Sequence, residues 1–273
     1  MSFNFNVQGI TTADNTQTGG STVIDAISPQ NIKGLCYWID GEINTRKGQD
    51  RSYKGMQNLV GGDYLPKIPS GMQEAMNGTP VFGDKWCTLG GTGFMPNYAS
   101  SEQTIELCIE FSAKPYTFSN IIYVLHVPGD MEIWFGDNED TIVRRLTFHL
   151  FESGVVSLEA NKDFAAEYNQ RLYAAVRFKS GSTPEAEWFI NGISTGEPAT
   201  GKDTKLSSSG YNCGICGLGN TSTSSVVPTE SSKTPNGAFY GSTTKLYTLR
   251  RWTRCLSDEE ILQNYKLDYS RFN

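Results

Sequence analysis

The sequence predicts an all-β sandwich of two antiparallel sheets, closed by a short C-terminal helix and preceded by an extended N-terminal arm. Three observations support this fold class. Glycine (28 residues) and proline (11 residues) are spread along the chain, as the many turns of an all-β protein require. Several short segments alternate apolar and polar residues, which is the pattern of strands with one buried face. Residues 245–267 have the features of a strand that runs directly into a helix.

Composition limits both the size class and the partners. The 273 residues suit one large β domain or two small ones, and 38% hydrophobic and 12% aromatic residues can fill a sizeable core. The formal net charge of −6 argues against nucleic acid or an anionic membrane as the main partner. No apolar run reaches the roughly 18 residues of a transmembrane helix. We therefore expect neither nucleic-acid binding nor membrane insertion.

Residues 1–28 are predicted to form an N-terminal arm and linker, and residues 29–273 the compact domain. Phe3, Phe5 and Val7 alternate with asparagines, as in a half-buried strand, and a linker rich in Thr, Asn, Gln and Gly follows. A lone strand is unstable in water because its amide groups lack partners. The arm must add to a sheet edge of the same subunit or of a neighbour. We favour a neighbouring copy or assembly protein, which makes a homo-oligomer the expected state.

The compact domain contains a series of predicted strands. Residues 104–111 alternate most clearly, with Ile105 and Leu107 on one face and Glu106 and Glu110 on the other. The pair Asn191-Gly192 (residues 191–192) is a strong hairpin signal, since both residues tolerate positive φ. The predicted strands and hairpins are residues 34–41, 81–94, 104–111, 121–127, 131–135, 146–150, 155–158, 172–178, 187–193 and 213–219.

The C-terminal segment carries the strongest local signals. Ser257 and Glu260 fit a capping box, in which each side chain binds the backbone N–H of the other residue. Acidic residues in the first turn favour the positive end of the helix dipole. Trp252 is predicted to lie in the core. The apolar stripe that should pack on the sandwich consists of Ile261, Leu262 and Tyr265.

This segment resembles the closing segment of laminin-G-like (LamG) domains, members of the concanavalin A-like jelly-roll superfamily. In that family a last strand of the form val-arg-val-Tyr-Asn-Arg-Ala-Leu-Ser-Asp-Glu-Glu-Ile runs into a short helix. Residues 249–261, Leu-Arg-Arg-Trp-Thr-Arg-Cys-Leu-Ser-Asp-Glu-Glu-Ile, align with it, although Arg251 stands where the family usually has an apolar residue. The strand at residues 34–41 and the Asn191-Gly192 hairpin match more weakly. The resemblance covers residues 30–268 and implies a jelly-roll fold.

The cysteines indicate a reducing compartment. The six cysteines, at positions 36, 87, 108, 213, 216 and 255, are scattered in mostly apolar contexts and are interpreted as free thiols. Cys213 and Cys216 form a CxxC motif among glycines, which favours a strand over a redox helix, and a structural zinc would need about four ligands. The N-terminus lacks a basic segment followed by an apolar one. We expect synthesis in a reducing cytoplasm.

Motifs for catalysis are weak. The sequence has no GxSxG, P-loop or HExxH motif. His126 and His149 lie in separate predicted strands and are interpreted as structural residues. The same jelly roll carries glycoside hydrolases, which need paired carboxylates. Asp130 and Glu132 are the nearest candidates, but Asp130 lies in a predicted turn and no third carboxylate follows in step. We therefore expect a non-catalytic protein.

An acidic turn is the candidate ligand site. Asp137, Asn138, Glu139 and Asp140 supply oxygen atoms that either hold Ca²⁺ or face solvent, because EF-hand spacing is absent. No other cofactor is expected. Trp134 lies just before the turn and either fills the core or stacks on a sugar ring. In the second case it would form a glycan site with Asp137 and Asn138.

Three function classes stay open, because fold does not determine function. The first is a structural and recognition protein on a large assembly, such as a bacteriophage virion. The second is a stand-alone lectin-like module, and the third is a glycoside hydrolase. The missing signal peptide, in a fold that usually works outside cells, favours the first. On this hypothesis the protein is made in the host cytoplasm and located in the virion, and is otherwise extracellular. Its partners would be other virion proteins and host-surface glycans.

Overall fold

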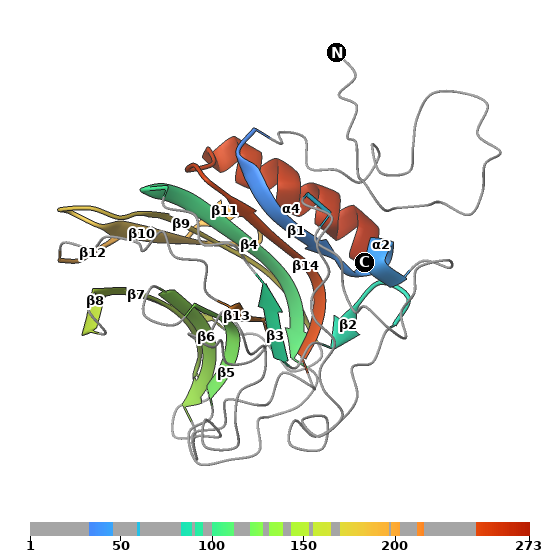
Figure 1. The fold of residues 1–273 in the computed structure, drawn as a ribbon. Helices are drawn as coiled ribbons and strands as arrows, with labels where there is room; N and C mark the ends of the chain where they lie inside the picture. Colours follow the sequence, from blue (N-terminus) through green and yellow to red (C-terminus); the bar gives the residue numbers. More distant parts are fainter. Residues whose placement is uncertain are drawn as a thin grey trace.

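A computed structural model shows a sandwich of two antiparallel sheets with a C-terminal helix on its outside (Figure 1). The predicted β-sandwich is therefore confirmed. No helix in the described part of the chain is long and apolar enough to cross a membrane. The structure describes residues 33–45, 59–60, 83–88, 91–94, 100–111, 121–127, 131–138, 143–152, 155–164, 170–196, 198–202, 212–215 and 244–273.

Among these residues, eight strands form the larger sheet. The main path runs β1-β14-β4-β9-β10-β11, with β12 paired to β10 and β2 paired to β14. The short helix α2 (Gly41–Thr45) follows β1. The last strand of the described chain thus lies between β1 and β4, in the body of the sheet. The strands are β1 (Leu35–Asp40), β2 (Cys87–Thr88), β4 (Glu102–Phe111), β9 (Arg171–Lys179), β10 (Glu185–Ile190), β11 (Ile193–Ser194), β12 (Ala199–Thr200) and β14 (Thr244–Trp252).

The smaller sheet has six strands within the described ranges, in the order β3-β13-β5-β6-β7-β8. Its second half is a meander in which each strand pairs with the next one along the chain. The register places Glu132 opposite His149, and His149 opposite Glu159. These three residues therefore share one face of the sheet. The strands are β3 (Gly91–Phe94), β13 (Asn212–Ile215), β5 (Ile121–Val127), β6 (Met131–Asn138), β7 (Val143–Glu152) and β8 (Val155–Phe164).

The main core lies between the two sheets. The apolar faces predicted for the strands point inward, and side chains of both sheets interdigitate there, as in other sandwiches. A hydrogen bond of 3.0 Å from Nε1 of Trp188 to the carbonyl of Ala160 joins β10 to β8. Burial of each large apolar side chain stabilises the fold by about 1.5–3 kcal/mol. The inward side chains include Ile105, Leu107, Ile109, Ile133, Phe135, Phe148, Leu150, Leu158, Val176 and Trp188.

The C-terminal helix α4 (Asp258–Phe272) covers the outer face of the larger sheet (Figure 1). The predicted capping box is present: Oγ of Ser257 accepts from the Glu260 N–H at 3.3 Å, and Glu260 accepts from the Ser257 N–H at 2.9 Å. Trp252 is fully buried in a second apolar cluster beneath the helix, as predicted. Of the predicted stripe, Ile261 is buried, whereas Leu262 and Tyr265 are half-buried.

Charged side chains are buried between α4 and the larger sheet. Asp268 accepts two hydrogen bonds from Arg250, at 2.7 and 2.5 Å, and both residues are almost completely buried. Arg250 also lies 3.5 Å from Glu106. The two carboxylate oxygens of Glu106 accept from Nδ2 of Asn264 at 3.1 and 3.2 Å. Four polar residues from three elements thus form one connected network under the helix.

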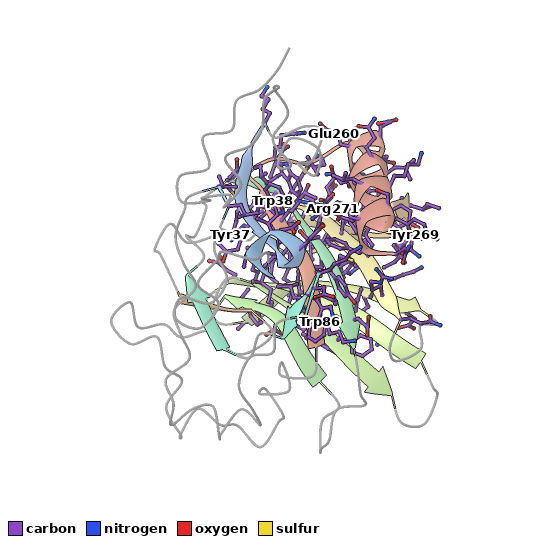
Figure 2. All side chains as sticks on the ribbon, turned by 90° about the vertical axis from the view of Figure 1, so that its right-hand side faces the viewer. Tyr37, Trp38, Trp86, Glu260, Tyr269 and Arg271 are labelled. Atoms are coloured by element: carbon purple, nitrogen blue, oxygen red, sulfur yellow. The ribbon has the colours of Figure 1, made fainter. Side chains whose placement is uncertain are left out.

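A second ion pair fixes the end of the helix. Arg271 donates to Asp40, at the end of β1, at 2.8 Å and to Glu42 of α2 at 3.0 Å. In Figure 2, Arg271 points from α4 toward β1 and α2, whereas Tyr269 lies on another side of the helix. Tyr269 is 58% exposed. The helix is therefore attached to the sheet by charge pairing as well as by apolar packing.

One local prediction is confirmed in detail, and one departure from the expected pattern has a structural explanation. Asn191 and Gly192 have φ values of 52° and 76°, so both central residues of the β10–β11 hairpin adopt the positive φ expected of Asn-Gly. Arg251, which departs from the LamG pattern, is fully buried, and its Nε donates to Oε1 of Gln103 at 2.7 Å. This hydrogen bond explains how a guanidinium occupies a position where an apolar residue was expected.

The cysteine prediction is confirmed where side chains are described. Cys36, Cys108 and Cys255 are free thiols. Burial raises the pKa of both Cys108 and Cys255 above the usual value, which keeps these thiols protonated. Cys213 lies in strand β13, as interpreted from the glycines around it. Cys216 lies outside the described residues.

The arm formed by Phe3, Phe5 and Val7 lies outside the described residues, as does the proposed division of the chain at residue 28. Both stay predictions.

Candidate functional site

The outward face of β6, β7 and β8 carries an array of polar and aromatic side chains. Alternate residues of these strands, such as Ile133 and Phe148, enter the core, so their neighbours point away from it. We call the outward set the outer strip. It consists of Glu132, Trp134, Arg145, Thr147, His149, Phe151, Glu159, Asn161 and Asp163.

A histidine between two carboxylates forms the centre of the outer strip. Nδ1 of His149 lies 2.7 Å from Oε1 of Glu132, and its Nε2 lies 3.5 Å from Oε2 of Glu159. The side chains of His149 and Glu132 are only 12% and 11% exposed, whereas Glu159 is 53% exposed. The row therefore runs from a covered end on β6 to an open end on β8. The hydrogen bond between Nδ1 and Glu132 holds the imidazole in place, whereas Nε2 approaches Glu159 without a hydrogen bond.

Two aromatic rings flank this histidine. The Trp134 ring lies edge-on to His149, with centroids 6.0 Å apart and planes at 76°. Phe151 lies on the other side along β7, with centroids 5.9 Å apart and planes at 88°. Trp134 is half-buried and lies on the outward face, so of its two predicted roles the core-filling one is wrong. The strip thus combines rigid apolar surface with polar groups.

Two further polar rows continue the strip along β7 and β8. Oγ1 of Thr147 donates to Oδ1 of Asn161 at 2.6 Å, and Asn161 in turn donates to Glu159. Arg145 donates from Nε and Nη2 to the two oxygens of Asp163, at 2.6 and 3.2 Å. These hydrogen bonds lower the pKa of Asp163, so its carboxylate stays ionised above acidic pH. The hydrogen bonds fix the side chains before any ligand arrives.

The chemistry of this array favours recognition. A glycoside hydrolase needs room for the glycosidic oxygen between its two carboxyl groups. Here the imidazole of His149 fills the space between Glu132 and Glu159. Among the described residues, no group of three or more His, Cys, Asp and Glu side chains is arranged to hold a metal ion. The strip instead offers fixed donors, acceptors and aromatic edges, which suit a hydroxyl-rich ligand.

The other predicted site residues are only partly described. The backbone of Asp137 and Asn138 completes β6 and pairs with Arg144 and Val143 of β7, and nothing is described of the side chains. Glu139 and Asp140, together with the carboxylate candidate Asp130, lie outside the described residues. The calcium site therefore stays a prediction. The backbone of His126 pairs with Glu132, which adds β5 to the same row of the sheet.

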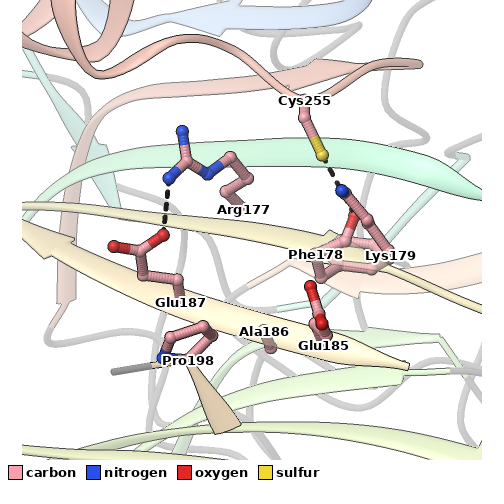
Figure 3. Close-up of a pocket in the computed structure, with 8 residues that line it drawn as sticks. All are labelled: Arg177, Phe178, Lys179, Glu185, Ala186, Glu187, Pro198 and Cys255. Carbon is pink, nitrogen blue, oxygen red and sulfur yellow. Dashed lines mark hydrogen bonds and ion pairs between the residues drawn. The ribbon is translucent and has the colours of Figure 1, made fainter. Parts of the chain in front are cut away.

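A pocket of about 330 Å³ lies on the outer face of the larger sheet, beside the start of α4 (Figure 3). Charged groups that line it make contacts within the protein that stabilise the fold. Arg177 binds Glu187 at 2.5 Å and Asp258 at 2.8 Å, and it also donates to the Leu256 carbonyl at 3.0 Å. The second oxygen of Glu187 accepts from Ser194. These contacts connect β9 and β10 to the helix, and we assign the pocket a structural role.

Comparisons with known proteins identify the fold. No protein-family model matches the sequence, and no curated protein matches it. The botulinum neurotoxin type G receptor-binding domain is similar, with a TM-score of 0.52 and 11% identity over 86% of this chain and 51% of that one. The binding domain of Paraclostridial Mosquitocidal Protein 1 has a TM-score of 0.53 and 11% identity, covering 88% and 53%. Trypanosoma rangeli sialidase in complex with sialic acid has a TM-score of 0.49 and 10% identity, covering 85% and 32%.

The chain thus spans about half the length of the two toxin binding domains and about a third of the sialidase. The TM-scores of 0.52 and 0.53 show that this chain shares its fold with the two binding domains, and identities of 11% leave the ligand open. The sialidase likeness, with a TM-score of 0.49, carries no further argument.

The sequence pattern singles out Trp134, Glu132 and His149 separately and does not unite them in one site. Each histidine was interpreted separately because the two lie in different strands. The signal was present in the predicted strands of residues 131–135 and 146–150: pairing these two strands with Glu132 opposite His149 unites a carboxylate and an imidazole on one face.

Proposed function

We propose that this protein is a non-catalytic recognition module that binds carbohydrate on its outer strip. The observation that carries the proposal is the Glu132–His149–Glu159 row with Trp134 and Phe151 on either side. Sugars present both hydroxyls and an apolar ring face, and such a ligand needs planar polar groups beside aromatic surface. The fold shared with a receptor-binding domain supports a recognition role.

Hydrolysis is the competing function for this face, because glycoside hydrolases also use carboxylates on a sheet. The imidazole between Glu132 and Glu159 argues against it, since a substrate would have to displace a ring that is hydrogen-bonded to Glu132. The covered position of Glu132 argues in the same direction, because a catalytic acid must reach the glycosidic oxygen.

We further propose that the sandwich is a LamG-like jelly roll displayed on a large assembly such as a phage virion. Residues 249–261, which resemble the LamG closing segment, support the first part. The N-terminal arm supports the second, because an added strand is a direct way to join copies of a protein. Binding of a host-surface glycan would then attach the particle to its target.

The proposal is tested by glycan-array binding followed by calorimetry on the best neutral oligosaccharide found. Trp134→Ala is expected to weaken binding at least tenfold, because it removes the aromatic edge beside the histidine. Glu159→Gln is expected to weaken it similarly, and this exposed residue can be changed without disturbing the core. Tyr269→Ala is the matched control: it removes an exposed aromatic ring on α4 and should leave affinity unchanged.

Two results would contradict the proposal. The first is a wild-type protein that binds no glycan on the array, with circular dichroism showing that it is folded. The second is release of reducing sugar that is abolished by Glu132→Gln, which would make the protein a hydrolase.

A further inference from the structure

The charges on the outer strip are already matched with one another. Its acidic side chains are Glu132, Glu159 and Asp163, and its basic ones are Arg145 and His149. Asp163 occupies two donors of the Arg145 guanidinium, and His149 lies between the two glutamates. Among the described side chains of the strip, the one guanidinium, that of Arg145, is therefore bound to a carboxylate, and acidic groups outnumber basic ones.

We infer, building on the carbohydrate-binding function proposed above, that the strip selects glycans without acidic groups and rejects sialylated, uronic-acid and sulfated ones. A carboxylate or sulfate on a sugar needs a cationic partner, ideally the two-pronged donor set of arginine. In Arg145 two of these donors, Nε and Nη2, already bind the carboxylate of Asp163. An anionic sugar would meet the charges of Glu159 and Asp163 instead, and like charges across an interface disfavour a partner.

Uncharged hydroxyls fit the same groups well. A sugar hydroxyl can donate to the exposed carboxylate of Glu159, and it can accept from the amide of Asn161. Hydrogen bonds to charged acceptors are stronger than those between neutral groups. The acidic strip therefore binds neutral sugars through the groups that repel acidic ones.

The shape of the strip indicates an oligosaccharide. Its side chains on β7 occupy every second residue from Arg145 to Phe151. The six steps between these seven residues of extended strand span about 20 Å, at roughly 3.4 Å per step. The strip is thus long enough for a chain of several sugar rings, and we expect affinity to rise from disaccharide to tetrasaccharide.

The test compares matched glycans on the full-length protein. N-acetyllactosamine oligomers are titrated calorimetrically with and without a terminal sialic acid, beside neutral chito- and malto-oligosaccharides of two to six sugars. Wild-type protein should bind the best neutral series at least tenfold more tightly than any acid-bearing glycan of the same length. Asp163→Asn removes a negative charge and frees Arg145. The ratio of the affinities for neutral and acid-bearing glycans should therefore fall at least fivefold.

Asp163 and Arg145 are half exposed, so these variants should remain folded. The matched control is the double variant Arg145→Ala with Asp163→Asn, which has no guanidinium at this position. It should not show the improved relative binding of acid-bearing glycans that is expected of Asp163→Asn alone. A wild-type preference for the sialylated member of a pair would overturn the selectivity while leaving carbohydrate binding intact. An unchanged preference in Asp163→Asn would also overturn it. Failure to bind any glycan would instead remove the proposed function itself.

Discussion

At the scale of single residues, Glu106 is the least expected feature of the protein. Its side chain lies fully buried in the middle of the larger sheet, where Asn264 and Arg250 contact it. Burial raises the pKa of Glu106 to about 7, and the charge of Arg250 only partly opposes this shift. The folded protein therefore holds a proton on Glu106 under conditions in which the unfolded chain releases it.

This shift predicts the direction of the pH dependence of stability. Because the folded pKa is raised, the contribution is fully present below the ordinary pKa of 4.5 and is lost as pH rises toward 7. The loss is on the order of 3 kcal/mol between pH 4.5 and 8. Glu106→Gln cannot titrate. Between pH 4.5 and 8 its free energy of unfolding should therefore fall by about 3 kcal/mol less than that of the wild type. Urea unfolding at several pH values measures the difference.

Glu102→Gln is the matched control, since Glu102 lies exposed at the start of the same strand and should follow the wild-type curve. Parallel pH curves for wild type and Glu106→Gln would show that Glu106 does not hold the proton.

At the scale of elements, α4 is specified both locally and by packing. The capping box and the acidic first turn start the helix at a defined residue. Ile261 and Phe272 then pack on the sheet, and Arg250 and Asp268 pair across the interface. Local signals therefore fix where the helix begins, and contacts with the sheet fix how it lies.

Substitutions on α4 separate its buried residue from its half-buried neighbour. Ile261→Ala should cost about 2–5 kcal/mol, because it deletes methyl groups from a closed cluster. Leu262→Ala should cost clearly less, because Leu262 is half-buried. Denaturant titration with a common slope compares them. Equal losses would mean that both residues contact the core to the same extent.

The elements were largely predictable and their partners were not. Alternation identified the strand at residues 104–111, which the structure extends to Glu102–Phe111. For the strand that begins at residue 131, alternation predicts an end at Phe135, whereas β6 continues to Asn138. The strand is longer because backbone pairing with β7 needs no apolar residues. Glu106 was assigned correctly to the face opposite Ile105. Its burial depends on Asn264, 158 residues later, which no local pattern contains.

The same holds for the candidate site: single residues could be predicted from the sequence, and the contacts between them could not. Trp134 stands out in the sequence as a large aromatic residue in a strand. The contact of Glu132 with His149, 17 residues apart, needs the register of the hairpin. The sequence-predicted fold class is confirmed because it depends on many independent strands, and the site was only partly found because it depends on a few exact pairings.

At the scale of the whole molecule, the sandwich and its N-terminal arm should be separable. The described residues, which begin at Lys33, include both sheets and the helix. Deletion of residues 2–20 should therefore leave the melting temperature nearly unchanged and abolish self-association or incorporation into a particle. Light scattering and co-assembly with the native partners measure these properties. Normal assembly of the truncated protein would show that the arm is dispensable and would remove the main support for the virion hypothesis.

The position of β14 has a consequence for how a cell makes this protein. Oγ1 of Thr248 donates to the carbonyl of Ile39, a contact that spans 209 residues, and β14 separates β1 from β4 in the sheet. Until the ribosome has made β14, β1 and β4 have no strand between them and their edges stay open to other chains. The larger sheet can therefore close only after translation has passed the codon of Trp252. A message truncated before that codon yields an aggregation-prone fragment in place of a smaller domain.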